Sequence, residues 1–212
     1  MQTHYAYTCG GVDLKVTFTA PLFMEDLKLL SRPVNYLTYS VAARDGREHE
    51  VEVYFEASPR WALDQPYQQS ASKGYEADGL LYLKSGSKEQ NILAKQGDDL
   101  RIDWGYFYMV AGKENTAYSV GNSTELRKNF VNGTLNSASL EGEDSNGNMA
   151  LVRSHGKVKN VTDKIMLGYD DIYSIQYFGT NLRPYWNSKG DRTIEAEMLA
   201  AYNEYDKLLA RC

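Results

Sequence analysis

The sequence has few of the residues that metal centres and disulfide scaffolds need. Its 212 residues include two cysteines, Cys9 and Cys212 at opposite ends, and three histidines, His4, His49 and His155. A disulfide scaffold has more cysteines in a shorter chain, and a zinc site has clustered cysteine or histidine ligands. The histidines share no metal-ligand spacing with each other or with a cysteine. We therefore expect two unpaired thiols, no metal site and no cofactor.

Long apolar runs and basic clusters are also lacking. The longest apolar runs fall far short of the roughly 20 residues that a membrane-spanning helix needs. The net charge is −5 with no basic block, which argues against nucleic acid as the partner. Residues 2–4 show neither the basic nor the apolar segment of a secretory signal peptide. The sequence therefore predicts a chain with no membrane span and no nucleic-acid partner.

The motifs of several enzyme classes are absent as well. There is no GxSxG nucleophile elbow, no phosphate loop and no GxGxxG dinucleotide motif. Carboxylates remain, notably Asp103, Asp170 and Asp171 beside aromatic residues. A glycosidase needs one acid as proton donor and a second as nucleophile or base, but acids at strand ends more often stabilise turns. We favour the turn role, and a self-contained glycosidase using Asp103 or Asp171 is the weakest alternative.

What the sequence has in quantity is tyrosine, with 17 residues, and apolar residues that alternate with polar ones. Val12 to Thr19 alternates cleanly, as a strand with one buried face does. Residues 34–58 contain two such runs around Asp45-Gly46, which predicts a β-hairpin. Further strands are expected in these segments: 80–84, 92–95, 100–111 with a bulge at Gly105, 149–154, 158–167 and 169–178. Residues 135–140 and 149–154 are expected to form a second hairpin.

Helical signals lie in three segments, of which the first, residues 24–30, is compatible with one helical turn before Pro33. Asn122 and Glu125 form a capping box for a short helix that Gly133 closes. Residues 193–211 repeat apolar side chains at helical spacing, with acids in the first turn and Lys207 and Arg211 in the last. About ten strands with little other helix predict an all-β fold, an antiparallel, supersandwich-like β-sandwich with a C-terminal amphipathic helix. We assign residues 1–190 to the sandwich domain and residues 191–212 to the helix.

Aromatic residues near the acids suggest a contact surface. We expect interdomain or ligand contacts from seven residues: Trp104, Asp103, Tyr169, Asp170, Asp171, Tyr185 and Trp186. The same aromatic residues would also suit a sandwich core or a domain contact, and we favour that interpretation because aromatic rings dominate both settings. One alternative is a carbohydrate-binding module, tested at Trp104 and Trp186, and the other is an accessory sandwich of a glycoside hydrolase-like enzyme. The aromatic platform on which sugar rings would stack consists of Trp61, Trp104, Tyr106, Tyr108, Tyr169, Tyr173, Tyr185 and Trp186. No catalytic residue is assigned.

Several blocks of the sequence resemble the glutaminase A family. The first block runs from Thr19-Ala20-Pro21-Leu22 through residues 29–38, and it is the most specific. The resemblance continues through residues 51–55, 102–106, 173–178 and 184–186, so that it covers most of the chain. The part of the family that it matches is the non-catalytic region that precedes a helical catalytic domain.

The resemblance implies a β-sandwich module placed before an α-helical domain that hydrolyses L-glutamine to L-glutamate and ammonia. It implies that the partner is this helical domain of the same chain, with a small molecule or glycan as a further ligand, and that the protein is secreted or periplasmic. The apolar stripe of the helix at 193–211 needs a cover. It can fold back on the sandwich or lead into the next domain, and given the resemblance we expect the connector role.

Overall fold

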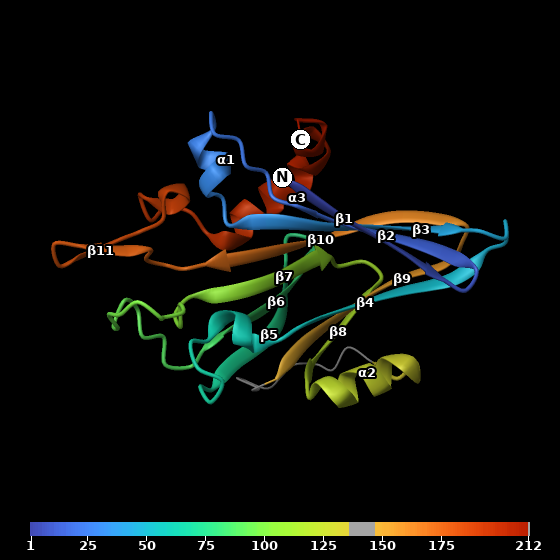
Figure 1. Cartoon of the computed structure of the whole chain (residues 1–212), viewed down its shortest axis with the longest axis horizontal. Coiled ribbons are helices and arrows are strands. Elements are labelled where there is room, and N and C mark those ends of the chain that lie inside the picture. The colour runs from blue at the N-terminus through green and yellow to red at the C-terminus, as the bar shows by residue number, and fades with distance from the viewer. Residues whose placement is uncertain (136–146, 212) are drawn as a thin grey trace.

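Most of the predicted strands join one large antiparallel sheet, which the computed structural model shows within the residues that it describes, 1–135 and 147–211 (Figure 1). Its seven strands follow the order β1-β2-β3-β10-β7-β6-β5. Their bounds are β1 (Gln2–Cys9), β2 (Val12–Thr19), β3 (Val34–Ala43), β5 (Ser70–Ala77), β6 (Leu80–Ser87), β7 (Tyr106–Gly112) and β10 (Asn160–Asp170).

A second sheet lies against the first. It contains β4 (His49–Ala57), β9 (Asn148–Val158) and β8 (Thr116–Gly121), in that order. A separate hairpin of β11 (Ile175–Tyr177) and β12 (Thr180–Leu182) extends away from both sheets at the left of Figure 1. The predicted all-β antiparallel sandwich is therefore confirmed.

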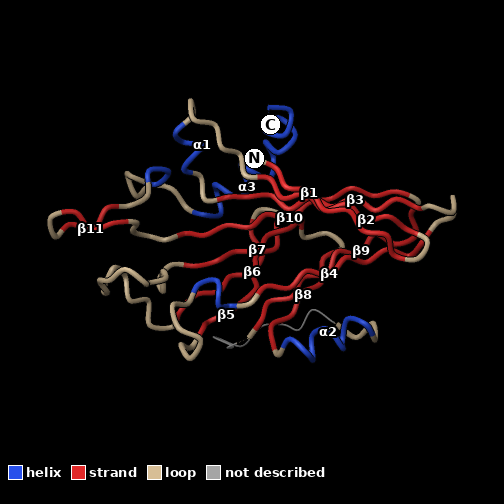
Figure 2. The backbone as a smooth tube through the Cα atoms, in the orientation of Figure 1, coloured by secondary structure: helices blue, strands red, loops and turns tan. Residues whose placement is uncertain are grey.

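The helical segments are short except for the last one. They are α1 (Leu27–Ser31), α2 (Ser123–Val131) and α3 (Ile194–Arg211), with two 3₁₀ turns, η1 (Pro59–Ala62) and η2 (Tyr185–Asn187) (Figure 2). The Asn122 side chain accepts hydrogen bonds from the N–H groups of Thr124 and Glu125, as the predicted cap requires. Gly133, at φ 65°, follows the end of α2. Both of the longer predicted helices are confirmed.

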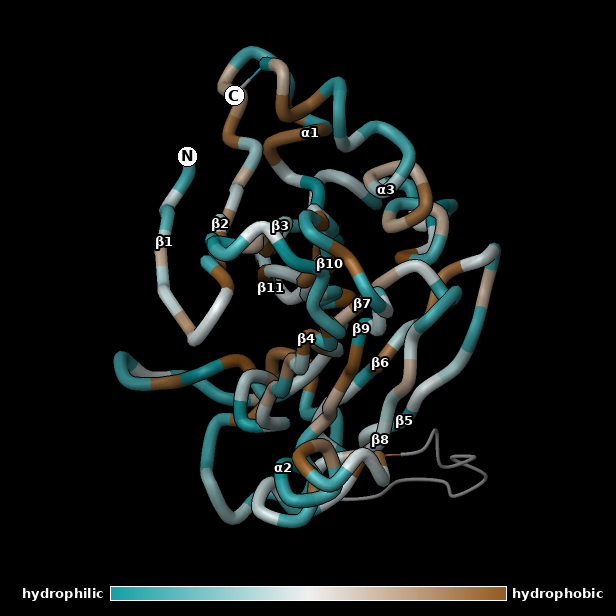
Figure 3. The backbone as a smooth tube through the Cα atoms, turned by 90° about the vertical axis from the view of Figure 1, so that its right-hand side faces the viewer, coloured by the Kyte–Doolittle hydropathy of each residue, from teal (hydrophilic) through white to brown (hydrophobic). Residues whose placement is uncertain are grey.

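The two sheets enclose the first of two apolar cores. Alternate side chains of β3, β6, β7 and β10 meet those of β4, β8 and β9, and hydrophobic segments of these strands lie in the interior in Figure 3. The buried members of this core are Leu37, Tyr39, Ala62, Leu81, Leu83, Phe107, Met109, Ala111, Met149, Leu151 and Ile165. The sandwich core thus contains the residues that the alternation placed on one face of each strand.

The second core lies on the other face of the large sheet, beneath α3. Tyr36 donates a hydrogen bond from its hydroxyl to the carbonyl of Ala201, at 2.9 Å, and packs against the ring of Tyr205. The buried Glu197 carboxylate pairs with Arg32 at 3.1 Å, which links α3 to the segment after α1. The apolar stripe of α3 is therefore covered by this chain's own sheet. The stripe gives no support to the connector role, which stays a prediction.

The predicted hairpin at residues 34–58 is wrong. β3 pairs with β2 and β10 in the large sheet, whereas β4 pairs with β9 in the small one. The Asp45-Gly46 turn crosses from one sheet to the other, with the Asp45 carboxylate accepting hydrogen bonds from the Arg47 N–H and the His49 ring. Two runs that each have an apolar face can cover one another across a sandwich as well as pair edge to edge, and alternation does not separate these cases.

Other predicted boundaries shift. Residues 92–95 form no strand, and the strand predicted at 100–111 begins at Tyr106, after Gly105 at φ 75°. The run at 169–178 divides between the end of β10 and β11. β5 and β8 carry weak alternation and were not predicted. Residues 136–140, one side of the second predicted hairpin, lie outside the described residues.

No helix among the described residues is long and apolar enough to cross a membrane.

Candidate functional site

The carboxyl end of β10 and the start of β7 bring together four of the predicted site residues, Trp104, Tyr169, Asp170 and Asp171. The two strands are antiparallel neighbours, with Asp170 opposite Tyr106. Gly105 makes this possible, because a Cβ atom at its position would collide with the backbone carbonyl of Asp170. Only glycine, which has no Cβ atom, fits so close to a neighbouring strand.

Hydrogen bonds fix the aromatic members of this cluster. The indole N–H of Trp104 donates to the carbonyl of Tyr173 at 2.9 Å. The hydroxyl of Tyr169 donates to the carbonyl of Trp104 at 2.5 Å. Burial, followed by the nearby carboxylates of Asp171 and Asp103, raises the pKa of the Tyr169 hydroxyl. Tyr169 therefore stays a neutral donor that joins the two strand ends.

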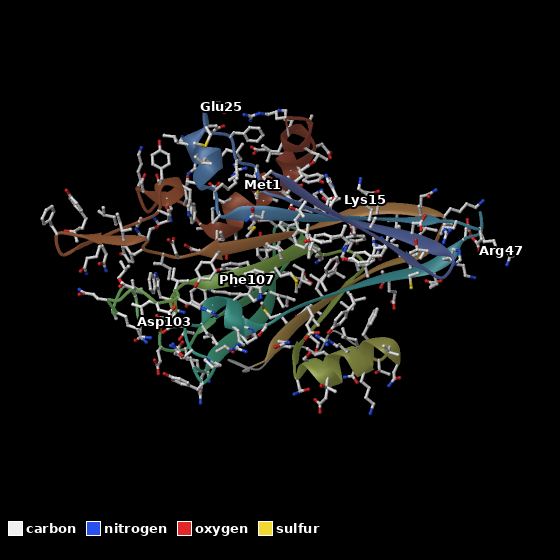
Figure 4. The ribbon with its side chains drawn as sticks, in the orientation of Figure 1. Met1, Lys15, Glu25, Arg47, Asp103 and Phe107 are labelled. Carbon is white, nitrogen blue, oxygen red and sulfur yellow. The ribbon has the colours of Figure 1, made fainter. Side chains whose placement is uncertain are left out.

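Asp103 is the most deeply buried of the predicted acids, with 1% of its surface exposed. Its carboxylate accepts hydrogen bonds from Lys95 Nζ at 3.0 Å and from Gln68 Nε2 at 2.9 Å. Lys95 also reaches Asp64 at 3.2 Å. Figure 4 shows Asp103 at the end of the molecule from which the β11–β12 hairpin extends. Asp103 thus joins three loop segments through its Oδ2 atom.

The two acids at the end of β10 stabilise the backbone that follows them. Asp170 Oδ1 accepts the N–H of Ile172 at 3.0 Å, and Asp171 Oδ2 accepts the hydroxyl of Ser174 at 2.6 Å. Burial raises the pKa of the Asp170 carboxyl. Ile172, a β-branched residue, has a positive φ of 59°, which is strained for this side-chain type. These acids therefore hold a strained turn at the start of the hairpin.

Residues 172–183, which we name the arm, carry large apolar side chains in solvent. The exposed fractions are 55% for Ile175, 60% for Tyr177 and 92% for Phe178. Every residue of β11 and β12 is exposed. In Figure 1 the arm lies clear of the two sheets. The arm is the most exposed apolar segment next to the predicted site.

The remaining two predicted residues, Tyr185 and Trp186, follow the arm in η2 but point to different environments. Tyr185 is 55% exposed, whereas Trp186 is 4% exposed and belongs to the core beneath α3. Trp186 is therefore a core residue whose ring cannot stack on a surface ligand. Trp104, with its indole N–H bonded within the chain, is only partly accessible.

A hollow of about 400 Å³ lies beside Tyr169, and no residue of the arm lines it. Trp61 stands at its edge, 65% exposed, with its ring 5.4 Å from that of the buried Phe107. Met1 and Phe107, labelled in Figure 4, also line it. Its other lining residues are Thr3, Phe18, Thr19, Ala20, Pro33, Asn35, Tyr36, Leu167, Gly168 and Tyr169. Aromatic rings with a few polar groups give it the character of a small-molecule pocket.

The described residues contain no cluster of three or more histidine, cysteine or acidic side chains arranged to hold a metal ion. Each histidine has a partner nearby: His4 contacts Thr17, His49 contacts Asp45, and His155 contacts Tyr39. Cys9 is a free, exposed thiol, and Cys212 lies outside the described residues. The histidines thus act in local hydrogen bonding.

Two features of this region are only partly predicted by the sequence. Trp61 belongs to the predicted aromatic platform but not to the seven contact residues, because one tryptophan in a polar loop carries no signal of the hollow beneath it. Phe178 is predicted as the last residue of a strand. A Phe-Gly pair was not recognised as a two-residue turn, for which Asn-Gly is the usual sequence.

The comparisons with family models and with curated proteins indicate similarity at the family level. A family model described as "Domain of unknown function (DUF5127)" matches residues 1–212. Glutaminase A of Aspergillus oryzae is 28% identical over 200 residues, a match covering 84% of this chain and 28% of that protein. A solved structure named "Putative kojibiose phosphorylase from human microbiome" matches with a TM-score of 0.40 and 8% identity, over 97% of this chain and 20% of that chain. The chain spans under a third of the curated relative that it matches.

Proposed function

This chain belongs to the DUF5127 family, and from that premise we propose that it is a non-catalytic accessory domain of a larger glutaminase-like amidohydrolase. In that polypeptide another domain, which we expect to be helical, would hydrolyse L-glutamine to L-glutamate and ammonia. The sequence similarity to Glutaminase A supports this proposal, as does the short share of that protein, 28%, which the match covers.

The observation that supports the non-catalytic role is that the predicted acids are hydrogen-bonded within the chain. Asp103 is buried and bonded to Lys95 and Gln68, while Asp170 and Asp171 are bonded to the turn that follows them. An acid–base pair for hydrolysis must reach the substrate and exchange protons with it. Carboxylates that are committed to the backbone and to neighbouring side chains serve folding instead.

Substitution of these acids in the larger polypeptide tests the role. We expect Asp171→Asn to leave kcat for glutamine within about threefold of the parent value, because an amide oxygen can still accept the Ser174 hydroxyl. A catalytic acid or base contributes about 10²- to 10⁴-fold. A folded Asp171→Asn protein with kcat at least about a hundredfold lower would overturn the non-catalytic role.

A glycan-binding role is the second candidate, and Trp61 favours it. Its exposed ring is held over the buried Phe107 at the edge of the hollow, which is the arrangement of an aromatic platform for a sugar ring. The other two tryptophans predicted for this role, Trp104 and Trp186, are less accessible than Trp61. Of the aromatic residues in the predicted platform, Trp61 is therefore the one on which this candidate depends.

A glycan array followed by titration checks the second candidate. We expect any glycan ligand to lose at least about tenfold in affinity on Trp61→Ala, which corresponds to about 1.4 kcal/mol. Tyr67→Ala is the matched control, since Tyr67 is 81% exposed and does not line the hollow. Equal affinities in both variants, or no glycan bound by the parent, would remove the glycan role.

A further inference from the structure

The arm has one apolar face and one polar face. Ile175 pairs with Leu182 and Tyr177 pairs with Thr180, so that these side chains share a face of the hairpin. On the opposite face, Gln176 Nε2 donates to Asn181 Oδ1 at 3.1 Å. Both faces are exposed. An isolated two-stranded hairpin is marginally stable in water, so an uncovered apolar face contributes nothing to its folding.

The residue at the tip is unfavourable for the turn that it occupies. Phe178 and Gly179 are the two loop residues, at φ 45° and φ 78°, which defines a turn with both central φ angles positive. Asn-Gly is the favoured pair in such a turn, and phenylalanine is disfavoured there. Phe178 is also 92% exposed. Neither turn geometry nor burial within the described residues explains a phenylalanine at this position, and unexplained strain of this kind is concentrated at functional sites.

The base of the arm, in contrast, is held firmly. Ser174 N donates to the carbonyl of Leu182 at 2.9 Å, and the Trp104 indole holds the carbonyl of Tyr173. The guanidinium of Arg183 lies 4.9 Å from the centre of the Tyr173 ring, a cation–π contact. A fixed base with an exposed aromatic tip presents the tip in a defined direction, which lowers the entropic cost of binding.

The charge of the segment indicates what kind of surface it would meet. Arg183 is the one charged residue of the arm, and the next charged residues along the sequence are Asp171 before it and Lys189 and Asp191 after it. A complementary surface would therefore carry an apolar pocket for Phe178 with acidic groups at its rim. Aromatic side chains and arginine are the residues that most often provide the binding energy of an interface.

We propose that the arm docks its apolar face and the Phe178 ring into an acidic-rimmed apolar pocket on the neighbouring domain of the same polypeptide. The inference rests on the proposed function, because that function supplies the neighbouring domain. The similarity to a relative of which this chain covers 28% is the reason for choosing a domain in cis over a second copy. The interaction surface consists of Ile175, Tyr177, Phe178 and Leu182, with Arg183 at its edge.

Thiol labelling at the arm tests the proposal. Thr180→Cys, in a background with Cys9→Ser and Cys212→Ser, places a reactive thiol beside Phe178 and leaves the aromatic side chains in place. We expect a maleimide to label it at least about tenfold more slowly in the larger polypeptide than in the 212-residue chain, because closure of an interface blocks access. Tyr67→Cys is the matched control, with an expected ratio within about twofold.

A second variant shows whether slow labelling at residue 180 depends on the Phe178 ring. Phe178→Asn fits the turn and should leave the hairpin folded, yet in the larger polypeptide it should restore rapid labelling at Thr180→Cys. Equal labelling of Thr180→Cys in both polypeptides would overturn the proposal. So would concentration-dependent protection in the 212-residue chain alone, since the arm would then bind a second copy.

Ammonia release measured on the same samples separates this inference from the proposed function. Slow labelling of Thr180→Cys in the larger polypeptide without glutamine turnover would support the docking of the arm and remove glutamine as the substrate. Equally fast labelling in both polypeptides, with glutamine turnover by the larger one, would support the accessory role and overturn the docking of the arm.

Discussion

Asp170 and Asp45 are carboxylates whose surroundings shift their pKa values in opposite directions. Burial raises the pKa of Asp170, whereas the Arg47 N–H, followed by the His49 ring, lowers the pKa of Asp45. The stability that protonated Asp170 provides is present below the unfolded pKa and is lost as pH rises through the raised folded value. For Asp45 the stability is present above the unfolded pKa and is lost as pH falls through the lowered folded value.

Amide substitution at these two positions should therefore change stability with opposite sign. At pH 7 we expect Asp170→Asn to raise Tm by roughly 1–3 °C, because an uncharged amide removes the buried charge and can still accept the Ile172 N–H. Asp45→Asn should lower Tm at pH 7. Both differences should shrink near pH 3, where the parent carboxylates take up protons. Thermal unfolding of the three proteins across this pH range measures both, and a lower Tm for Asp170→Asn at pH 7 would contradict the account.

At the scale of elements, the contact between β7 and the end of β10 depends on the absence of a side chain at Gly105. We expect Gly105→Ala to destabilise the fold by more than Gly46→Ala, which shares the positive φ but has open space around its Cβ position. The strain at φ alone costs about 1–2 kcal/mol, and the collision should add at least about 1–3 kcal/mol. Urea denaturation of both variants separates the free-energy cost of the positive φ from the cost of the collision. Equal losses would show that β10 and β7 are not in close contact here.

Elements with a local chemical signal could be predicted from the sequence, and those fixed by distant contacts could not. α2 follows from the Asn122 cap and α3 from its apolar stripe, since both signals lie within one segment. The pairing of β3 with β10 joins residues more than 100 positions apart, and alternation within each strand does not identify that partner. The turn at Asp45-Gly46 was misassigned for the same reason.

The candidate site was predicted in part. The sequence placed Trp104, Tyr169, Asp170 and Asp171 among the contact residues, and the structure brings these four together at one end of the sandwich. Trp186 lies in the core beneath α3, because the apolar stripe of that helix needs a large buried ring to pack against. The exposure of Phe178 and Trp61 depends on the tertiary structure, and the local sequence pattern does not predict it.

At the scale of the whole molecule, the central strands of the large sheet are buried on both faces, by the small sheet on one side and by α3 on the other, whereas β1 at the sheet edge is exposed. Two cores of this kind give the chain a stable frame. The loops at one end hold their acids in structural contacts and expose an arm. This division between a packed frame and an exposed apolar arm is the physical basis of the accessory role that we propose.

Ammonia release from glutamine, compared between this 212-residue chain and the larger polypeptide that contains it, tests that role most directly. We expect no turnover above background by the 212-residue chain and turnover by the larger polypeptide, with kcat on the order of 1–10³ s⁻¹. Turnover at such a rate by the 212-residue chain alone would contradict the accessory role, because the catalytic groups would then lie within the residues that we assign to folding and docking.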